Sequence, residues 1–224
     1  NPMRIAAKAP CRVDIAGGTL DIWPLYLYHP GAVTVNFAIS RFQSCVIETR
    51  TDGHIVVHSE VRGSTEAFDS YSALCMAKRY RMPLVAYLLR FFEPAGGLDI
   101  RTESEAPLGA GIAGSSTLII ALVSALNRLN KSGYSLEQLR EISQNIEAQI
   151  IRVPTGSQDY YPAMYGGVSA IELGPGGIHR KAIQVDPEDL NERMVLAYTG
   201  VPRNSGINNW EVMKLHIDGD RRVH

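Results

Sequence analysis

The residues with the clearest potential for chemistry lie in a glycine-rich segment, residues 106–117, which reads APLGAGIAGSST. Glycine has no Cβ, so Gly109, Gly111 and Gly114 allow a sharp turn and let backbone N–H groups approach a ligand closely. The helix expected next leaves its first N–H groups unpaired and carries a partial positive charge at that end. The segment therefore predicts a phosphate-binding loop.

Three interpretations fit the spacing of these glycines. They match the dinucleotide pattern G-x-G-x-x-G, which also needs a second strand after the helix and an acidic residue about 20 positions on. They match the Walker spacing over residues 109–116, but Ser115 stands where a lysine is needed. A second helix follows instead of a strand, because Ser135 and Gln138 form a capping box before an apolar stripe. Both common phosphate folds are thus disfavoured, and a tight turn under a buried helix remains the structural alternative.

One arginine and two acidic residues outside the loop are further candidates, and each has a plainer interpretation. Arg12 lies in an expected strand, where it is either an edge residue or faces a polar site. Glu147 lies one position from the apolar stripe of the second helix, and most such glutamates are solvated. Asp159 precedes an aromatic pair, where an acid is often only a helix N-cap.

Metal-assisted phosphoryl transfer would give these residues a common purpose. It needs a phosphate cradle, a hard cation on oxygen ligands, and a carboxylate that orients or deprotonates the attacking hydroxyl. Ser116 and Glu147 could hold Mg²⁺, Asp159 could handle the hydroxyl, and Arg12 could offset developing charge.

The composition narrows the class of protein. Of 224 residues, 45% are apolar and 20% charged, which is enough apolar material for a sizeable core, and the net charge is −1. That charge offers no electrostatic case for binding nucleic acid or an anionic membrane surface. Three widely spaced cysteines favour a reducing compartment, and no segment is typical of a signal peptide or a membrane span. We expect a cytoplasmic protein and, from the ends at Asn1 and His224, an incomplete chain.

Periodicity and turn signals predict the secondary structure around these residues. The first sixty residues predict a small, mostly antiparallel sheet with a hairpin at Thr51-Asp52-Gly53. A polar stretch, residues 60–72, separates it from a helix over residues 83–92. Strands are expected at residues 4–15 (interrupted at Pro10), 32–39, 42–49, 54–58, 98–102, 168–173, 182–185 and 194–198. Residues 187–191 are expected to be a crossing, and residues 207–217 a helix.

Four ordered segments resemble the galactokinase, homoserine kinase, mevalonate kinase and phosphomevalonate kinase superfamily, abbreviated GHMP. Residues 109–117 resemble its second motif, in the form G-S-G-L-G-T-S-S-A, and residues 9–21 resemble its first. Glu147 with residues 158–167 resembles the acid pair and G-G turn that follow. Residues 199–205, TGVPRNS, resemble the T-G-x-x-R-x-S segment of the heptose-phosphate kinase branch.

The resemblance implies an α+β protein. Residues 1–190 would form an N-terminal ATP-binding domain like domain 2 of ribosomal protein S5, and residues 191–224 would begin a truncated ferredoxin-like C-terminal domain. It implies Mg²⁺ on Ser116 and Glu147, with Asp159 as catalytic base and Arg12 as its electrostatic partner. It implies ATP contacts from Pro107, Gly109, Ala110, Gly111, Ile112, Ala113, Gly114, Ser115 and Ser116. It places Gly18, Thr19, Asp21, Asp159, Tyr165 and Arg203 against the acceptor.

Two departures from the family pattern matter. Ala113 replaces the second glycine of G-L-G, which costs free energy if that position needs φ > 0. Leu20 interrupts the G-G-T-D form of the first motif, which affects contacts with the acceptor. The expected activity is that of an ATP- and Mg²⁺-dependent kinase for a hydroxyl of a sugar or sugar phosphate, with a lean towards the anomeric hydroxyl of a heptose 7-phosphate. The alternatives are a mevalonate-pathway kinase and a non-catalytic nucleotide-binding relative.

Overall fold

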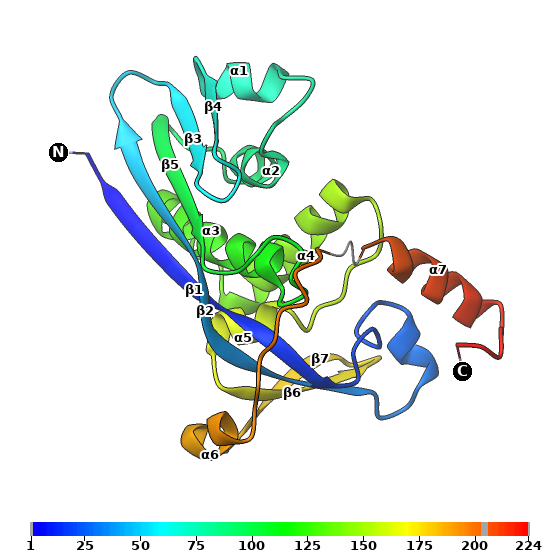
Figure 1. Ribbon diagram of the computed structural model, residues 1–224. Helices are drawn as coiled ribbons and strands as arrows, with labels where there is room; N and C mark the ends of the chain where they lie inside the picture. Colours follow the sequence, from blue (N-terminus) through cyan, green and yellow to red (C-terminus); the bar gives the residue numbers. More distant parts are fainter. Residues whose placement is uncertain (1, 203–205, 224) are drawn as a thin grey trace.

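A computed structural model describes residues 2–202 and 206–223 of the chain. Seven strands form one mixed sheet in the order β4-β3-β5-β2-β6-β7, with β1 also paired to β2 (Figure 1). The strands are β1 (Arg4–Ala16), β2 (Val33–Arg50), β3 (Ile55–Ser59), β4 (Ser64–Phe68), β5 (Gly97–Ser104), β6 (Val168–Gly174) and β7 (Gly177–Ile183). The helices are η1 (Leu25–Tyr28), α1 (Tyr71–Met76), α2 (Pro83–Phe92), α3 (Gly114–Asn130), α4 (Leu136–Ile151), α5 (Tyr160–Tyr165), α6 (Pro187–Glu192) and α7 (Gly206–Ile217).

The long strand β2 organises the sheet and differs from the expected pair of strands. It runs unbroken through residues 40–41 and is antiparallel to β1, β5 and β6. The expected interruption of β1 at Pro10 is instead a register shift between Pro10 and Arg12. Proline cannot donate to a ladder, and a bulge absorbs that loss without ending the strand. The bulge precedes Arg12, one of the candidate site residues.

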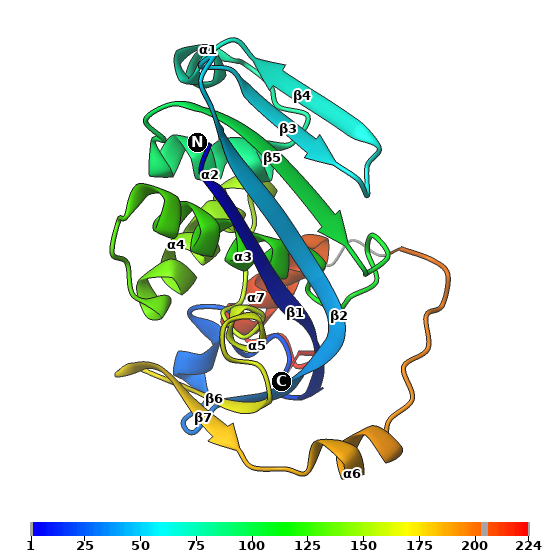
Figure 2. The ribbon, with the colours of Figure 1, turned by 90° about the vertical axis from the view of Figure 1, so that its left-hand side faces the viewer.

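The hairpin expected at residues 51–53 does not pair β2 with β3. The strand β5 lies between them, parallel to β3 and antiparallel to β2 (Figure 2). Its residues Leu98 and Ile100 are almost fully buried, as befits a central strand. The polar stretch at residues 60–72 also contains a strand, β4, which pairs with β3. The burial of β5 between β2 and β3 therefore determines which strands pair, in spite of the hairpin signal at residues 51–53.

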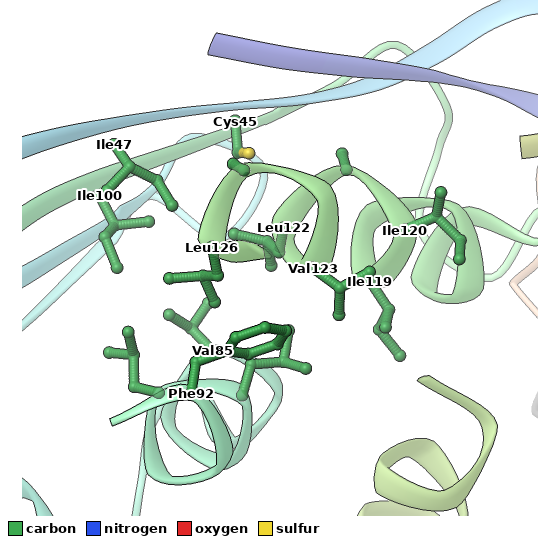
Figure 3. Close-up of a cluster of buried hydrophobic side chains, with 14 of the residues drawn as sticks. Cys45, Ile47, Val85, Phe92, Ile100, Ile119, Ile120, Leu122, Val123 and Leu126 are labelled. Carbon is green, nitrogen blue, oxygen red and sulfur yellow. The ribbon is translucent and has the colours of Figure 1, made fainter. Parts of the chain in front are cut away.

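The helix α3, which follows the glycine-rich loop, lies between the sheet and α2 (Figure 3). Its residues Ile119, Leu122 and Leu126 have no exposed surface. Each such side chain stabilises the fold by roughly 1.5–3 kcal/mol relative to exposure. The helix α2 has the expected bounds, and the expected capping box of Ser135 and Gln138 begins α4. This packing gives the glycine-rich loop a rigid base.

The C-terminal part confirms two expectations and corrects two. The strands β6 and β7 form the expected hairpin, although β7 begins at Gly177 rather than at residue 182. The helix α7 confirms the helix expected at residues 207–217. The crossing at residues 187–191 is the short helix α6, capped by Asp186, and residues 194–198 form no strand. Within the described ranges, no helix is long and apolar enough to cross a membrane.

Candidate active site

Arg12 and Asp159 form the centre of the site. The carboxylate oxygen Oδ1 of Asp159, at the start of α5, accepts hydrogen bonds from Nε and Nη2 of Arg12 at 2.8 and 2.6 Å. Nη1 of Arg12 donates to the carbonyl of Gly111 at 3.0 Å, and its backbone N–H donates to the carbonyl of Ile112. Asp159 occupies the N-cap position without making a side-chain cap bond. Arg12 therefore joins this acid to the glycine-rich loop.

The glycine-rich loop leads into α3 through left-handed backbone. Gly109 and Gly111 have φ of 69° and 77°, and Ala113, at the N-cap, has φ of 60° and ψ of 36°. The position held by Ala113 does need φ > 0, so the departure from the family's glycine strains the loop. No side chain caps the first turn of α3. Its N–H groups and partial positive charge therefore face the cavity, as a phosphate site requires.

The variant Ala113→Gly is expected to be more stable than the native chain by up to about 1 kcal/mol. A left-handed residue with a Cβ costs roughly 1–2 kcal/mol, and glycine removes this strain. Part of the gain in stability is lost, because glycine also gives the unfolded chain more conformational entropy. Urea unfolding followed by circular dichroism measures the difference. Ala110→Gly, one turn earlier in the same loop where φ is not positive, is the control and should lose stability. Equal losses for both variants would contradict the strain at Ala113.

Glu147 lies beneath the loop and is only 6% exposed, so the interpretation of a solvated glutamate is wrong. Its carboxylate accepts hydrogen bonds from the hydroxyls of Ser115 at 2.7 Å, Ser116 at 2.8 Å, and Tyr160. Burial raises the pKa of Glu147, and these hydroxyls offset part of that rise. Tyr160 was not singled out from the sequence, and only its place in an aromatic pair signalled burial. The cluster brings together one acid and three neutral hydroxyls.

Asp21, in the turn after β1, is 3% exposed and close enough to Asp159 for their charges to interact. Its Oδ2 accepts a hydrogen bond from the backbone N–H of Gln158 at 2.8 Å. Gly156 leaves room for it, because a Cβ there would lie 1.9 Å from Oδ2. Burial first, and then the charge of Asp159, raise the pKa of Asp21 to about 7. Thr19, with φ of 79°, holds the turn that carries Asp21 inward.

The raised pKa of Asp21 predicts a pH dependence of stability. The folded chain keeps this proton up to about pH 7, whereas the unfolded chain releases it near 3.8, so the folded state binds more protons between these values. The contribution of Asp21 to the free energy of unfolding is then fully present below about pH 4 and is lost as the pH rises towards 7. The loss is about 4 kcal/mol at most. Asp21→Asn should flatten this slope in urea unfolding measured from pH 4 to 7. An unchanged slope would contradict the shift.

A cleft of about 1090 Å³ connects these groups. It is lined by every proposed nucleotide-contact residue of the loop and also by Arg12, Gly18, Thr19, Asp21, Glu147 and Asp159. Tyr165 does not line it: its ring stacks on Tyr161, Arg180 lies over it, and its hydroxyl donates to Glu137. Contact of Tyr165 with an acceptor therefore has no support in this arrangement. Arg203 lies outside the described residues.

Residues 76–167, which hold the loop, Glu147 and Asp159, match the family model described as "GHMP kinases N terminal domain". This segment is a GHMP kinase N-terminal domain. The GHMP family expected from the motifs is thereby confirmed, and the mixed α/β sheet agrees with the fold of its solved members. The match includes the loop and both acids but not Arg12 or Asp21, which the fold brings to the domain from β1 and the turn after it.

Curated proteins named as sugar or sugar-phosphate kinases are similar to this chain. D-glycero-α-D-manno-heptose 7-phosphate kinase of Campylobacter jejuni is 26% identical over 90% of this chain and 61% of the relative. A galactokinase of Thermotoga neapolitana is 28% identical over 71% of this chain and 43% of the relative. A crystal structure of a D-glycero-D-manno-heptose 1-phosphate kinase from Bacteroides thetaiotaomicron shares the fold. Its TM-score is 0.75 at 21% identity, over 85% of this chain and 63% of that one. The chain thus spans less than two thirds of the length of each of these proteins.

Proposed function

We propose that this chain belongs to an ATP- and Mg²⁺-dependent kinase that transfers the γ-phosphoryl group to a hydroxyl of a sugar or sugar phosphate. The observation that carries the proposal is the contact of Arg12 with both Asp159 and the carbonyl of Gly111. This contact supports the proposal, because it brings Asp159, the candidate base, and the glycine-rich loop to one cleft. The names of the sugar-kinase relatives support the class of acceptor.

In this mechanism the loop N–H groups and the start of α3 bind the nucleotide phosphates. Asp159 takes the proton of the attacking hydroxyl, and Arg12 orients its carboxylate through two N–H bonds to one oxygen. The other carboxylate oxygen accepts nothing from Arg12 and is left for the hydroxyl. Arg12 also adds positive charge near the transferring group, which stabilises charge that develops in the transition state.

Glu147 and Ser116 fit a magnesium site. The buried carboxylate has only neutral hydroxyl donors around it, so a cation would offset a charge that is costly to bury. No group of three or more His, Cys, Asp or Glu side chains suited to a metal occurs in the described part of the chain. A single carboxylate and a hydroxyl suit Mg²⁺, which keeps waters and substrate phosphates as its other ligands. Bound there, Mg²⁺ would neutralise charge on the phosphates.

Glu147→Gln is expected to weaken Mg-nucleotide binding about tenfold or more while leaving the folded chain as stable as the native one or more so. The amide removes a buried charge yet keeps the size of the side chain. Thermal unfolding without metal, and calorimetric titration with Mg-ATP, measure the two effects. Glu141→Gln, on the exposed side of the same helix, should change neither. A large loss of metal-free stability would indicate a structural role instead.

We propose an N-terminal domain over residues 1–190 resembling domain 2 of ribosomal protein S5, the start of a ferredoxin-like domain over residues 191–224, and a cytoplasmic location. The lean towards the anomeric hydroxyl of a heptose phosphate rests on Gln158-Asp159 and on residues 199–205. A mevalonate-pathway kinase and a non-catalytic relative are the alternatives.

The test is coupled ADP release by the full-length protein with Mg-ATP, against sugars, sugar phosphates and mevalonate compounds. Turnover of a sugar or sugar phosphate supports the proposal. Turnover of mevalonate compounds alone, or ATP binding without turnover of any acceptor, overturns it in favour of the first or second alternative.

A further inference from the structure

The glycine-rich loop begins and ends beside one buried side chain, that of Gln43. This residue lies in β2, lines the cleft and is only 3% exposed. Its amide nitrogen Nε2 donates a hydrogen bond of 2.6 Å to the hydroxyl of Ser104, the last residue of β5 before the loop. A Cβ on Gly114, the first residue of α3 after the loop, would lie 3.6 Å from the same nitrogen. One amide group therefore lies against both ends of the loop.

The hydrogen bonds of Ser104 require that Gln43 acts as a donor. The hydroxyl of Ser104 donates to the carbonyl of Ala106 at 2.9 Å and accepts from the N–H of Ala106 at 3.1 Å. A hydroxyl has one proton and two lone pairs, so its proton is already used and its second lone pair is left for Nε2 of Gln43. The amide thus holds the backbone of Ala106, where the loop starts, through Ser104. A carboxylate of the same size has no proton for this bond.

Other contacts near Gln43 do not make the same connection. Sγ of Cys11 accepts from Nε2 at 3.7 Å, but sulfur is a weak acceptor. The N–H of Phe42 donates to the carboxylate of Glu105 at 3.1 Å, and the carbonyl of Phe42 accepts from the N–H of Glu105 at 2.9 Å. These bonds hold the residue before Ala106 to β2, and they do not extend to α3. Gln43 connects the start of the loop to the first turn of that helix.

The relative position of the two loop ends matters for phosphate binding. The N–H groups of the loop and the unpaired N–H groups at the start of α3 must point to one place to hold the same phosphates. Arg12 holds the later part of the loop, at Gly111 and Ile112. Gln43 and Ser104 hold its start. Because a displacement of about 1 Å in such a site reduces activity by up to about a hundredfold, a buried and hydrogen-bonded side chain at this place has a large effect.

We propose that Gln43 is a positioning residue of the phosphate-binding loop. Its amide holds the start of the loop, through Ser104, at a fixed separation from the N-terminus of α3. This rests on the proposed kinase function and names a residue that sets the affinity of that site for nucleotide. Gln43 acts through the backbone N–H groups of the loop and not by contact with the phosphates.

The experiment measures the affinity of the full-length protein for Mg-ATP by calorimetric titration, and KM for the acceptor sugar at saturating Mg-ATP. Gln43→Met keeps the length of the side chain but removes the donor, so it should weaken Mg-ATP binding about tenfold. Gln43→Glu should weaken it further, because a carboxylate cannot donate to Ser104 and adds negative charge beneath the phosphates. KM for the acceptor should stay within about twofold of the native value, because Arg12 still holds Asp159. Gln149→Met, on the exposed side of α4, is the matched control and should change neither quantity.

A double-mutant cycle tests the connection through Ser104. Ser104→Ala removes the acceptor of the Gln43 bond and should weaken Mg-ATP binding about as much as Gln43→Met. The double variant should bind Mg-ATP no more weakly than either single variant, because both changes break the same connection. Thermal unfolding shows which variants are folded, and Ser104→Ala supplies the test if Gln43→Met does not fold.

The outcomes separate the inference from the function on which it rests. Mg-ATP affinity within about twofold of the native value in folded Gln43→Met or Ser104→Ala overturns the inference and leaves the kinase function standing. Losses that add in the double variant, or a lower thermal stability with unchanged Mg-ATP affinity, overturn it in favour of a role in packing alone. A native protein that binds no Mg-ATP overturns the kinase function together with the inference.

Discussion

Asp159→Asn is expected to lower kcat about a thousandfold while nucleotide affinity changes little. A positioned general base contributes roughly 10²–10⁴-fold, and an amide cannot take the proton of the attacking hydroxyl. The contacts of Arg12 with Asp14 and with the carbonyl of Gly111 do not involve Asp159, so the loop should keep its position. ADP release with Mg-ATP and the preferred sugar measures kcat, and calorimetric titration measures nucleotide affinity.

The control for this loss is Asp69→Asn, the same chemical change at a side chain that is 98% exposed. It should keep full activity, because Asp69 lies outside the cleft. If Asp159→Asn keeps kcat within about threefold of the native enzyme, Asp159 is not the base. If the variant loses both activity and nucleotide binding, the acid serves instead to hold Arg12 and the loop in place.

Gly156→Ala is expected to destabilise the fold by about 3 kcal/mol. The added Cβ would lie 1.9 Å from Oδ2 and 2.5 Å from Cγ of Asp21, so the carboxylate would have to leave its buried place. The N–H of Gln158 would then lose its acceptor. Urea unfolding measures the loss, and the KM for the acceptor should rise in the surviving folded fraction.

Gly176→Ala is the matched control for this substitution. A Cβ at Gly176, in the turn between β6 and β7, meets no atom within 4 Å, and φ there is not positive. Its stability should lie within about 0.5 kcal/mol of the native chain. If both variants are equally stable, Asp21 does not occupy the packed position against Gly156.

The predictable part of this fold rests on local signals. The capping box at Ser135, the helix after Pro83 and the turn at residues 174–177 each depend on interactions within a few residues, and all three are present. The strand expected at residues 194–198 is wrong because an apolar run has no ladder without a partner strand. The hairpin at residues 51–53 is wrong because a turn signal does not specify which strand lies alongside.

The glycine-rich loop, its helix, the strain at Ala113 and the family could all be predicted from the sequence, because motifs and dihedral requirements are properties of adjacent residues. The packing of the elements was needed to bring Arg12 to Asp159, 147 positions away, and to bury Glu147 under Ser115 and Ser116. It also places Tyr165 away from the cleft. Spacing along a chain does not specify these contacts, because they depend on how β1, α4 and α5 pack around the same loop.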